Sequence, residues 1–277
     1  MSPGRLRAVS DSCDGGLPAA GAGQDAQILR ARSVLRAAGR IAIFSGAGLS
    51  TRSGIPDYRG PDGSWTLDPD SMRASHTAYY LAEAALRERS WQRRLASRVW
   101  EAKPNEGHRC LVPLSEQGRL AGVVTQNIDG LHQAAGLGPE EVVELHGTMW
   151  ASRCLSCGER RPMGETLERV RRGEADPRCQ AAGGRCGGVL SSDTVGFGER
   201  LDPSRIARAE EMLAAAEVVV AVGTSLSVHP AAGLVASAAR SGRGLVICNA
   251  SPTPYDGLAA ALVGGDVSET LPALLAP

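Results

Sequence analysis

The stretch Ser45–Gly60, SGAGLSTRSGIPDYRG, combines a glycine loop of the phosphate-binding type with reactive side chains. Gly46 and Gly48 directly follow the apolar run 41–44, and small residues at such a place let the backbone wrap around a phosphate. Thr51 stands where a complete dinucleotide fingerprint has a third glycine, and the absence of a Gly-Lys pair excludes a nucleoside-triphosphate loop. A dinucleotide loop is thus followed at once by an acid, an aromatic ring and a guanidinium: Asp57, Tyr58 and Arg59.

Four cysteines have a spacing that predicts a metal site. Cys154 and Cys157 form a Cys-x-x-Cys knuckle, and Cys179 and Cys186 follow. One pair places two thiolates on an ion and the second pair completes a tetrahedron, so the pattern favours Zn²⁺ in a closed, structural site. Cys179 and Cys186 lie further apart than in the usual ribbon, which repeats the tight knuckle. A redox pair at 154 and 157 is less favoured, because this knuckle does not open a helix after a strand.

Histidine is the side chain best suited to general-base chemistry near neutral pH. His146 follows an apolar run and has a glycine behind it, whereas His132 lies just past TQNIDG, on the helix expected there. The pattern favours His146 over His132 and leaves both as candidates. The other histidines are His76, His108 and His229.

Six short apolar runs predict the strands that position these groups. Runs of four to six residues that are apolar throughout are typical of parallel strands buried on both faces. Helical stretches separate many of them, and one begins at Asp202-Pro203, a helix cap followed by proline at the first position. This alternation predicts an α/β fold with a doubly wound, Rossmann-like parallel sheet. The runs are RIAIF (40–44), LAGVV (120–124), EVVEL (141–145), EVVVAV (217–222), GLVIC (244–248) and AALV (260–263).

Small or polar residues follow every one of these strands. In an open α/β sheet, ligands lie beyond the carboxyl ends of the strands, so the pattern favours a nucleotide-sized ligand over ordinary polar loops. The segments are 45–48 (SGAG), 125–130 (TQNIDG), 146–147 (HG), 223–225 (GTS), 249–251 (NAS) and 264–266 (GGD).

Two segments interrupt the alternation of strand and helix. Residues 61–118 hold little strand pattern and predict a mostly helical insertion, and residues 151–190 hold four of the seven cysteines and predict a zinc module. The sheet-containing part is then expected in residues 28–60, 119–150 and 191–277. Residues 1–27, rich in Gly, Ala, Ser and Pro, predict a flexible tail.

The composition excludes several classes of partner. Among 277 residues, thirty basic and thirty acidic side chains cancel, so we expect binding to neither nucleic acid nor an anionic membrane. No apolar stretch approaches the roughly 18–20 residues that cross a bilayer. The N-terminal segment holds no apolar core of a secretory signal. An odd cysteine count fits reduced thiols inside the cell, and we expect a cytoplasmic protein.

Taken together and in this order, several motifs resemble those of the sirtuins, the NAD-dependent protein-lysine deacylases. The resemblance covers about residue 28 to the end and suggests a bacterial member. Segments 89–100 and 103–111 are also similar to the branch that contains the mitochondrial sirtuin with lipoamidase and ADP-ribosyltransferase activity. The motifs are GAGLSTRSGIPDYRGPDGSW (46–65), TQNIDGLHQAAG (125–136), ELHGTM (144–149), the cysteine pairs, VGFGE (195–199), GTSLSVHP (223–230) and CNASPT (248–253).

The resemblance implies which residues bind NAD. The phosphates would lie against Gly46, Ala47 and Gly48, and a mobile loop over the nicotinamide ribose would carry Asp57, Tyr58 and Arg59. Gln126 and Asn127 would hold that ribose, and Ile128 and Asp129 would form the amide pocket. The remaining cofactor contacts would be Ser50, Trp65, Gly223, Thr224 and Ser225, with Asn249, Ala250, Ser251 and Val267 at the adenosine end.

The resemblance also implies the substrate site. Val195 and Phe197 would belong to the strand to which an acyl-lysine peptide adds backbone hydrogen bonds. Most sirtuins have phenylalanine at Tyr58 and a bulky residue at Gly196, and a glycine there could admit acyl chains longer than acetyl. The sequence offers no obvious basic pair for a succinyl carboxylate, so succinyl-lysine is not an expected substrate.

Sirtuin chemistry assigns the catalytic residues. The acyl oxygen of the modified lysine attacks the ribose as nicotinamide departs, with Asn127 and His146 as the implied catalytic residues and His146 as the general base on a ribose hydroxyl. Acyl-lysine proteins would be the partners, and NAD and Zn²⁺ the cofactors. Transfer of ADP-ribose to a protein side chain would use the same residues and stays an alternative. A non-catalytic NAD-binding module is a weaker one, because Asn127, Asp129 and His146 are all present.

Overall fold

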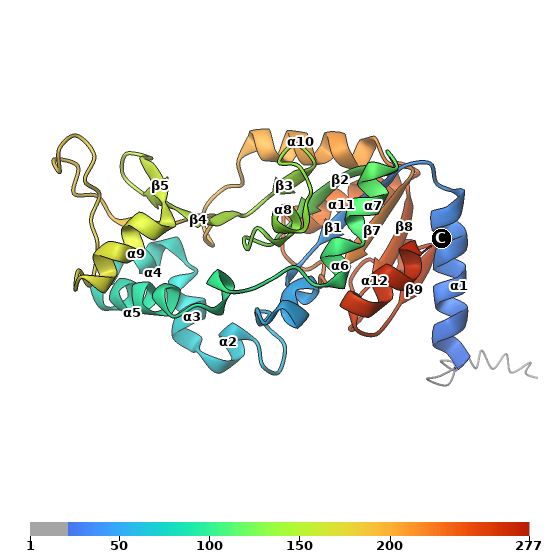
Figure 1. Cartoon of the computed structure of the whole chain (residues 1–277), viewed down its shortest axis with the longest axis horizontal. Helices are drawn as coiled ribbons and strands as arrows, with labels where there is room; N and C mark the ends of the chain where they lie inside the picture. Colours follow the sequence, from blue (N-terminus) through green and yellow to red (C-terminus); the bar gives the residue numbers. More distant parts are fainter. Residues whose placement is uncertain (1–21, 277) are drawn as a thin grey trace, which may run out of the picture.

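A six-stranded parallel sheet forms the centre of the larger lobe in the computed structural model, which describes residues 22–276 (Figure 1). Its spatial order is β3-β2-β1-β7-β8-β9, so the first strand of the sheet lies in the middle and the chain winds outward in both directions. This is the doubly wound order, and all six predicted strands are confirmed. The strands are β1 (Ile41–Ser45), β2 (Leu120–Thr125), β3 (Val142–Glu144), β7 (Val218–Val222), β8 (Gly244–Cys248) and β9 (Ala261–Val263).

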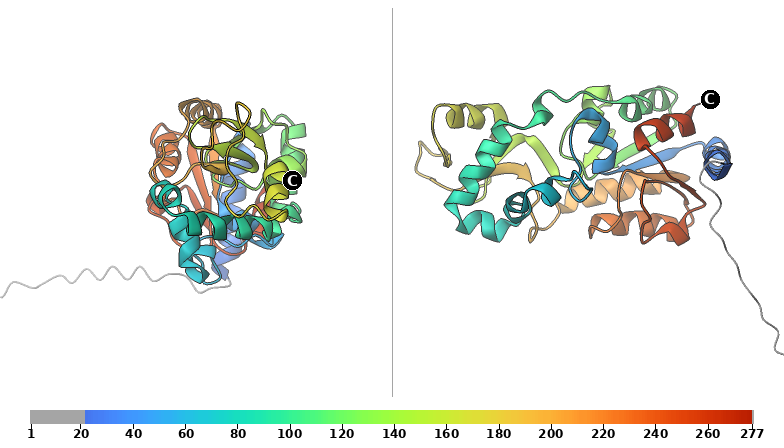
Figure 2. Two further views of the ribbon diagram at one scale, coloured as in Figure 1. Left: turned by 90° about the vertical axis from the view of Figure 1, so that its left-hand side faces the viewer. Right: turned by 90° about the horizontal axis from the view of Figure 1, so that it is seen from below.

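Helices cover both faces of this sheet, as Figure 2 shows from below. Successive residues of a strand point to opposite faces, so β7 contributes Val218 and Val220 to one apolar cluster and Val219 to the other. The first cluster includes residues of α1 (Ala22–Ala37), α7 (Leu111–Glu116) and α12 (Val267–Leu275). The second includes residues of α10 (Pro203–Ala214) and α11 (Ala231–Arg240). Burial on both faces explains why the strands are apolar throughout.

Carboxylate caps fix where two of these helices begin. The side chain of Asp202 accepts a hydrogen bond from the Ser204 amide at 2.8 Å, with Pro203 in the first position, as predicted for α10. Asp266 caps α12 in the same way, through the Ser268 amide at 2.9 Å. Each carboxylate therefore accepts a hydrogen bond from one of the amides at the start of its helix, which have no partner within the helix.

The smaller lobe is built on an antiparallel sheet that the sequence did not predict. Its strand order is β5-β4-β6, with β4 at Gly147–Cys154, β5 at Arg160–Pro162 and β6 at Leu190–Thr194. Beside it lie α9 (Met163–Arg171) and four helices of the predicted insertion, α2 (Ser64–Leu67), α3 (Pro69–Ala74), α4 (Thr77–Ala82) and α5 (Ala84–Leu95).

The two predicted insertions share one hydrophobic core. Trp91 of α5 is fully buried in the same cluster as Cys154 of β4 and Leu167 of α9. At the end of the predicted helical insertion, α6 (Glu106–Arg109) packs on α12, and Leu111 of α7 lies in the first apolar cluster. Short elements complete the chain: η1 (Ala47–Ser53), η2 (Arg98–Trp100), α8 (Leu131–Ala135) and η3 (Asp256–Leu258).

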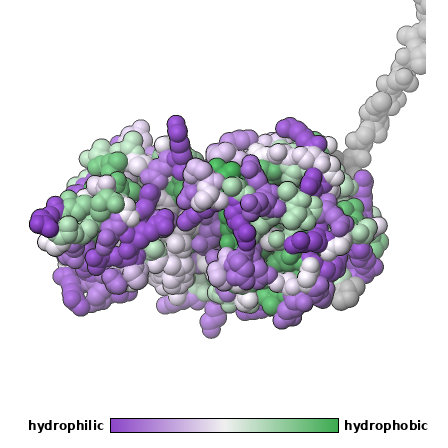
Figure 3. Space-filling view, turned by 90° about the horizontal axis from the view of Figure 1, so that it is seen from above, coloured by the Kyte–Doolittle hydropathy of each residue, from purple (hydrophilic) through white to green (hydrophobic). Residues whose placement is uncertain are grey.

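The predicted N-terminal tail, residues 1–27, falls mostly outside the described residues. Its last part, residues 22–27, belongs to the first turns of α1. Within residues 22–276 no helix has both the length and the apolar character needed to cross a bilayer. On the face drawn in Figure 3, hydrophilic side chains alternate with small apolar groups over both lobes.

A buried ion pair joins the two insertions. The guanidinium of Arg87, on α5, donates to the Asp176 carboxylate at 2.9–3.1 Å and to the carbonyls of Tyr80 and Leu81 at 2.8–2.9 Å. Both side chains of the pair are largely buried. Removing one partner of such a pair leaves a buried charge without compensation.

We expect Arg87→Met to lower the free energy of unfolding by about 3–5 kcal/mol, the usual cost of breaking a buried pair. The control is Arg89→Met on the same helix, because Arg89 pairs with Asp70 on the exposed surface. This substitution should lower the free energy of unfolding by less than about 1 kcal/mol. Urea denaturation followed by circular dichroism measures both. Equal losses in the two variants would contradict the assignment.

Candidate functional site

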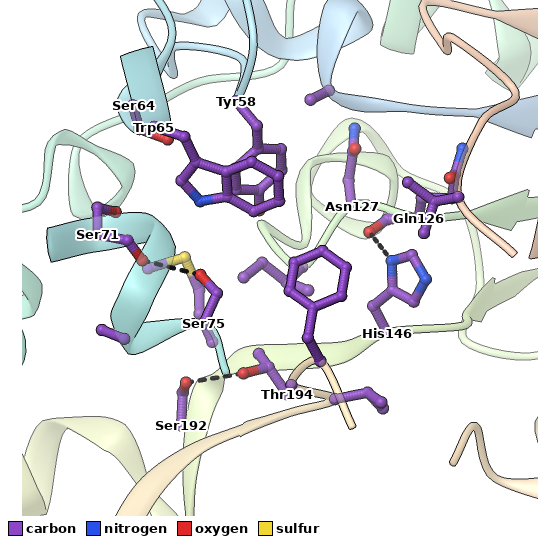
Figure 4. A pocket seen from close by; sticks show the side chains of 18 of the residues that line it. Tyr58, Ser64, Trp65, Ser71, Ser75, Gln126, Asn127, His146, Ser192 and Thr194 are labelled. Atoms are coloured by element: carbon purple, nitrogen blue, oxygen red, sulfur yellow. Dashed lines mark hydrogen bonds between the residues drawn. The ribbon is translucent and has the colours of Figure 1, made fainter. Parts of the chain in front are cut away.

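A cavity of about 630 Å³ lies beyond the carboxyl ends of the strands, where the two lobes meet. One side is lined by the segments that follow β1, β2 and β7, and the other by α3, α5 and β6 (Figure 4). The volume falls within the usual range for small-molecule sites. The cavity also sits at the switch point between β1 and β7, where doubly wound sheets bind ligands.

Glycines bring the two central loops into backbone contact. A Cβ on Gly46 would lie 2.7 Å from the carbonyl oxygen of Gly223, and one on Gly48 would lie 2.9 Å from the Gly223 Cα. Gly223 itself has a φ of 59°, which other residues rarely adopt. The Gly46 and Gly48 amides donate to the carbonyls of Val222 and Gly223. These glycines are therefore required by packing, and their amides are not free for a phosphate.

A chain of buried polar groups lies at the base of the cavity. The Asn127 side-chain amide donates to the Gly46 carbonyl at 3.1 Å and to the Ser50 hydroxyl at 3.2 Å. That hydroxyl donates in turn to the Asp129 carboxylate at 2.7 Å. Burial raises the pKa of Asp129, although hydrogen bonds from the Leu131 amide and Ser50 oppose the shift. Because each group is held by the next, the side chains of this base are fixed in position.

Gln126 and Thr224 connect this base to the loop after β7. The Gln126 side-chain amide donates to the Thr224 hydroxyl at 2.7 Å, and that hydroxyl also accepts the Leu226 amide at 3.2 Å. Ser225 lies beside Thr224 and its hydroxyl is 2.7 Å from that of Ser227. All three predicted residues line the cavity, so the sheet brings segments of distant sequence together there.

The two candidate bases occupy different environments. His146 lines the cavity, and its Nδ1 lies 3.0 Å from the Gln126 carbonyl oxygen, which leaves Nε2 as the second ring nitrogen (Figure 4). Burial lowers the pKa of His146, and the bond to Gln126 partly offsets the shift. His132 is almost fully buried behind β1, where its Nε2 lies 2.9 Å from the Ser45 hydroxyl. Of these two histidines, only His146 is placed to exchange a proton with a ligand.

Aromatic rings cover the cavity. Trp65 packs between Tyr58 and Phe197, with ring centroids 4.7 Å and 5.5 Å apart, and Phe197 in turn contacts His76 at 4.9 Å. The guanidinium of Arg59 lies 5.0 Å from the Trp65 ring. Apolar faces of this kind exclude water from whatever the cavity holds.

Six predicted cofactor-binding residues lie outside the cavity lining, and two predicted substrate-binding residues line it but lie outside β6. Val195 and Phe197 line it but follow β6 rather than belong to it, and their amides donate to the carbonyls of His146 and Ser75. Asn249 is half-buried and donates its side-chain amide to the Ser251 carbonyl, whereas Val267 is buried at the start of α12. The predicted residues absent from the lining are Gly48, Asp57, Asn249, Ala250, Ser251 and Val267.

Gly196 is explained by packing. A Cβ at this position would lie 2.5 Å from the Thr77 hydroxyl oxygen and 3.0 Å from the Ser75 carbonyl oxygen. The link between α3 and α4 therefore occupies the space that a side chain would take. A side chain at position 196 would have to displace these groups, and the expectation that the glycine admits longer acyl chains stays a prediction.

The four predicted cysteines form one cluster. The sulfur atoms of Cys154, Cys157, Cys179 and Cys186 all lie within 4.8 Å of one another, with nearest pairs at 3.7 and 3.8 Å. Tetrahedral Zn–S bonds of about 2.3 Å place two sulfurs roughly 3.8 Å apart, so the cluster fits the ion. The long spacing between Cys179 and Cys186 is accommodated by the turn at 181–185.

Sequence reasoning missed the half of the cavity nearest the smaller lobe. Hydroxyl groups dominate it, and we call it the hydroxyl pocket. Figure 4 shows several of its members opposite His146. Single serines scattered over helices and a short strand carry no motif, so no signal in the sequence could have found them. The pocket comprises Ser71, Ser75, Thr77, Ser90, Ser97, Ser191, Ser192 and Thr194.

Comparisons with known proteins agree with this geometry. NAD-dependent protein deacetylase 2 of Streptomyces coelicolor is 48% identical over 235 residues, which cover 85% of this chain and 96% of that protein. A solved structure on the mechanism and regulation of Sir2 enzymes superposes with a TM-score of 0.80 at 32% identity, over 91% of this chain and 97% of that one. A structure of Sir2Tm bound to a propionylated peptide gives a TM-score of 0.75 at 30% identity, over 86% and 93%.

The sequence profile of the Sir2 family matches residues 46–230, a span that includes the glycine loop, the polar base, His146 and the cysteine cluster. With this match, the fold and the relatives all in agreement, the chain belongs to the Sir2 family.

Proposed function

We propose that this protein is an NAD-dependent protein-lysine deacylase that yields lysine, nicotinamide and O-acyl-ADP-ribose from acyl-lysine, NAD and water. The observation that carries the proposal is the position of His146, a neutral histidine held through Nδ1 in a cavity whose base is formed by Asn127, Ser50 and Asp129. Its relatives include proteins named deacetylases and a Sir2 structure that holds a propionylated peptide.

The residues present fit NAD. When bound, NAD supplies the ribose carbon that accepts the acyl oxygen as nicotinamide leaves. Asn127 and Asp129 would hold the nicotinamide end over the polar base, while Ala47, Thr224 and Ser225 would face the phosphates. Asn249, just after β8, and Val267, at the start of α12, would hold the adenosine end. Tyr58 and Trp65 would shield the reacting sugar from water, because their rings cover the cavity.

His146 would accept a proton at its Nε2 atom. Its Nδ1 donates to the Gln126 carbonyl, which fixes the tautomer and leaves Nε2 to take the proton of a ribose hydroxyl. Because burial keeps the ring neutral at working pH, the base is available without prior deprotonation.

The acyl-lysine peptide would bind at residues 195–198. The amides of Val195 and Phe197 have acceptors within the chain, so a peptide strand would pair with the other backbone groups of this segment. The alternatives, ADP-ribosyl transfer and a non-catalytic module, gain no support from the relatives named above. A cytoplasmic location and the lack of nucleic-acid and membrane partners stay predictions.

We expect His146→Tyr to lower kcat/KM for an acetyl-lysine peptide by about 10²- to 10⁴-fold, the contribution of a positioned base. Release of nicotinamide measures the loss. The variant should keep its bound zinc and its thermal unfolding midpoint, because His146 is not part of either core. Near-native turnover in a folded variant would show that another group is the base.

The pH dependence should report His146 directly. Its pKa in the folded protein is lowered by burial, so the neutral base persists to more acidic pH than free histidine allows. We expect kcat/KM to fall only below about pH 6.5, with a single acid limb. Nicotinamide release between pH 5 and 8 measures this profile. An acid limb centred above that pH would contradict the burial argument.

The cysteine cluster gives a metal prediction. We expect Cys157→Ser to lose bound zinc and to unfold the smaller lobe, because structural zinc sites supply folding free energy to the segments that they join. Cys110→Ser is the matched control, since this half-buried thiol lies outside the cluster. Atomic absorption gives the zinc content. Retention of one zinc per chain in Cys157→Ser would argue against a four-cysteine site.

A further inference from the structure

His132, the candidate base that does not reach the cavity, begins a chain of buried hydrogen bonds behind it. Its Nε2 lies 2.9 Å from the Ser45 hydroxyl, at the end of β1. That hydroxyl donates to the hydroxyl oxygen of Thr125, at the end of the neighbouring strand β2, at 2.8 Å. The same oxygen accepts the backbone amide of Asn127 at 3.0 Å. The chain therefore connects His132 to the backbone of a predicted catalytic residue.

The direction of these hydrogen bonds assigns the proton on His132. The Ser45 hydroxyl has one hydrogen, which goes to Thr125, so the Ser45 oxygen can only accept from His132. Nε2 of His132 must therefore carry the proton. Its Nδ1 is left as a bare nitrogen, with no hydrogen-bond partner among the residues that the structure describes. His146 has the opposite tautomer, because its Nδ1 donates to the Gln126 carbonyl.

Burial keeps the His132 ring neutral. His108 of α6 packs against it edge to face, with ring centroids 5.0 Å apart, and both side chains are almost fully buried. Burial lowers the pKa of His132, and it lowers that of His108 to about 4, with a smaller contribution from Arg109. A neutral ring with one fixed N–H is a constant donor at neutral pH.

The loop that this chain holds carries most of the polar base of the cavity. Residues 126–130 connect β2 to α8, so Thr125 lies directly before the loop and His132 just past its end. Both of these side chains are bonded to Ser45, and the Gln126 amide donates to the Ser45 carbonyl at 2.9 Å. The loop is thereby attached at both ends to the residue that precedes the glycine loop, which fixes the two loops relative to each other.

A second pair of buried hydroxyls shows what a purely structural role looks like. The hydroxyls of Ser152 and Thr166 lie 2.7 Å apart, and both side chains are almost fully buried in the smaller lobe. Neither residue lines the cavity. The chain from His132 differs in where it ends, because the side chain of Asn127 lies in the cavity lining, close to that of Gln126 (Figure 4).

We propose that His132 is a positioning residue for deacylation, whose Nε2 proton orders Ser45 and Thr125 and thereby places Asn127 for the nicotinamide ribose. The inference rests on the deacylase function proposed above and gives a role to the histidine that was a candidate base. His132 exchanges no proton with a ligand and contacts none of the reacting atoms. Its loss is costly for catalysis, because a misplacement of about 1 Å can lower a rate by about 100-fold.

The test compares variants of the zinc-loaded full chain with an acetyl-lysine peptide and NAD. Thr125→Val deletes the central hydroxyl with little change of shape, and His132→Leu removes the donor. We expect each to lower kcat for nicotinamide release by about 10- to 100-fold. KM for the peptide should stay close to native, because residues 195–198 lie outside this chain. His132→Gln, which keeps an N–H donor at a similar distance from the backbone, should restore most of kcat.

Thr166→Val is the matched control, because it deletes the same hydroxyl from the buried pair in the smaller lobe. It should lower the thermal unfolding midpoint about as much as Thr125→Val does and keep the native kcat. The double variant of Thr125→Val and His132→Leu should have the kcat of either single variant, since one chain can be broken only once.

NMR reads the tautomer without any assay of activity. Long-range nitrogen–proton correlations of the ¹⁵N-histidine-labelled native protein, assigned with His132→Gln, should show the proton of His132 on Nε2 and that of His146 on Nδ1. Circular dichroism shows whether each variant is folded. If His132→Leu does not fold, Thr125→Val and the NMR measurement decide.

The outcomes separate this inference from the function on which it rests. If the native protein releases nicotinamide and folded Thr125→Val keeps the native kcat, or Thr166→Val loses as much, the positioning role is wrong and the deacylase assignment stands. A proton on Nδ1 of His132 also overturns it, as does a double variant whose loss is the product of the two single losses. If no acyl-lysine peptide releases nicotinamide from NAD with the native protein, the proposed function fails, and this inference fails with it.

Discussion

The close approach of two backbone loops at the centre of the sheet is the constraint on which the site depends. The loop after β1 and the loop after β7 touch through Gly46, Gly48 and Gly223, with no room for a Cβ between them. This contact places the Gly46 carbonyl where Asn127 donates to it, and it fixes the position of Thr224, which holds Gln126. Gln126 in turn fixes His146 through its carbonyl. A side chain at any of the three glycines would therefore disturb Gln126 and His146 as well, through the hydrogen bonds that connect them to these loops.

Burial then turns these contacts into a fixed arrangement. Asn127, Ser50 and Asp129 are each almost fully buried, and a buried polar group without a partner costs about 1–3 kcal/mol. Each of these side chains satisfies the next, so no member can rotate without leaving another unpaired. The cavity is thus preorganised by the fold itself, which is what a site that stabilises a developing charge requires.

The sequence predicted the large sheet well because its signal is local and strong. Strands buried on both faces must be apolar throughout, and six such runs gave six strands. The cysteine cluster and His146 were also predicted, since spacing and strand ends carry that information. The small antiparallel sheet was missed because β4, β5 and β6 are partly exposed and show no such run. The hydroxyl pocket was missed for a related reason, since its members come from separate elements that only packing brings together.

That packing also explains why the two insertions form one lobe. Trp91 from the helical insertion fills the core of the cysteine module, and Arg87, one turn earlier on the same helix, binds Asp176 of that module. The guanidinium of Arg94, which lines the cavity, lies 4.8 Å from the Trp91 ring centroid, so the residue that closes this core also contacts the cavity lining. The zinc ligand Cys154 ends β4, the strand that pairs with β6 and its serines. None of the four cysteines lines the cavity, yet Cys154 ends the strand that holds β6, which forms one wall of it.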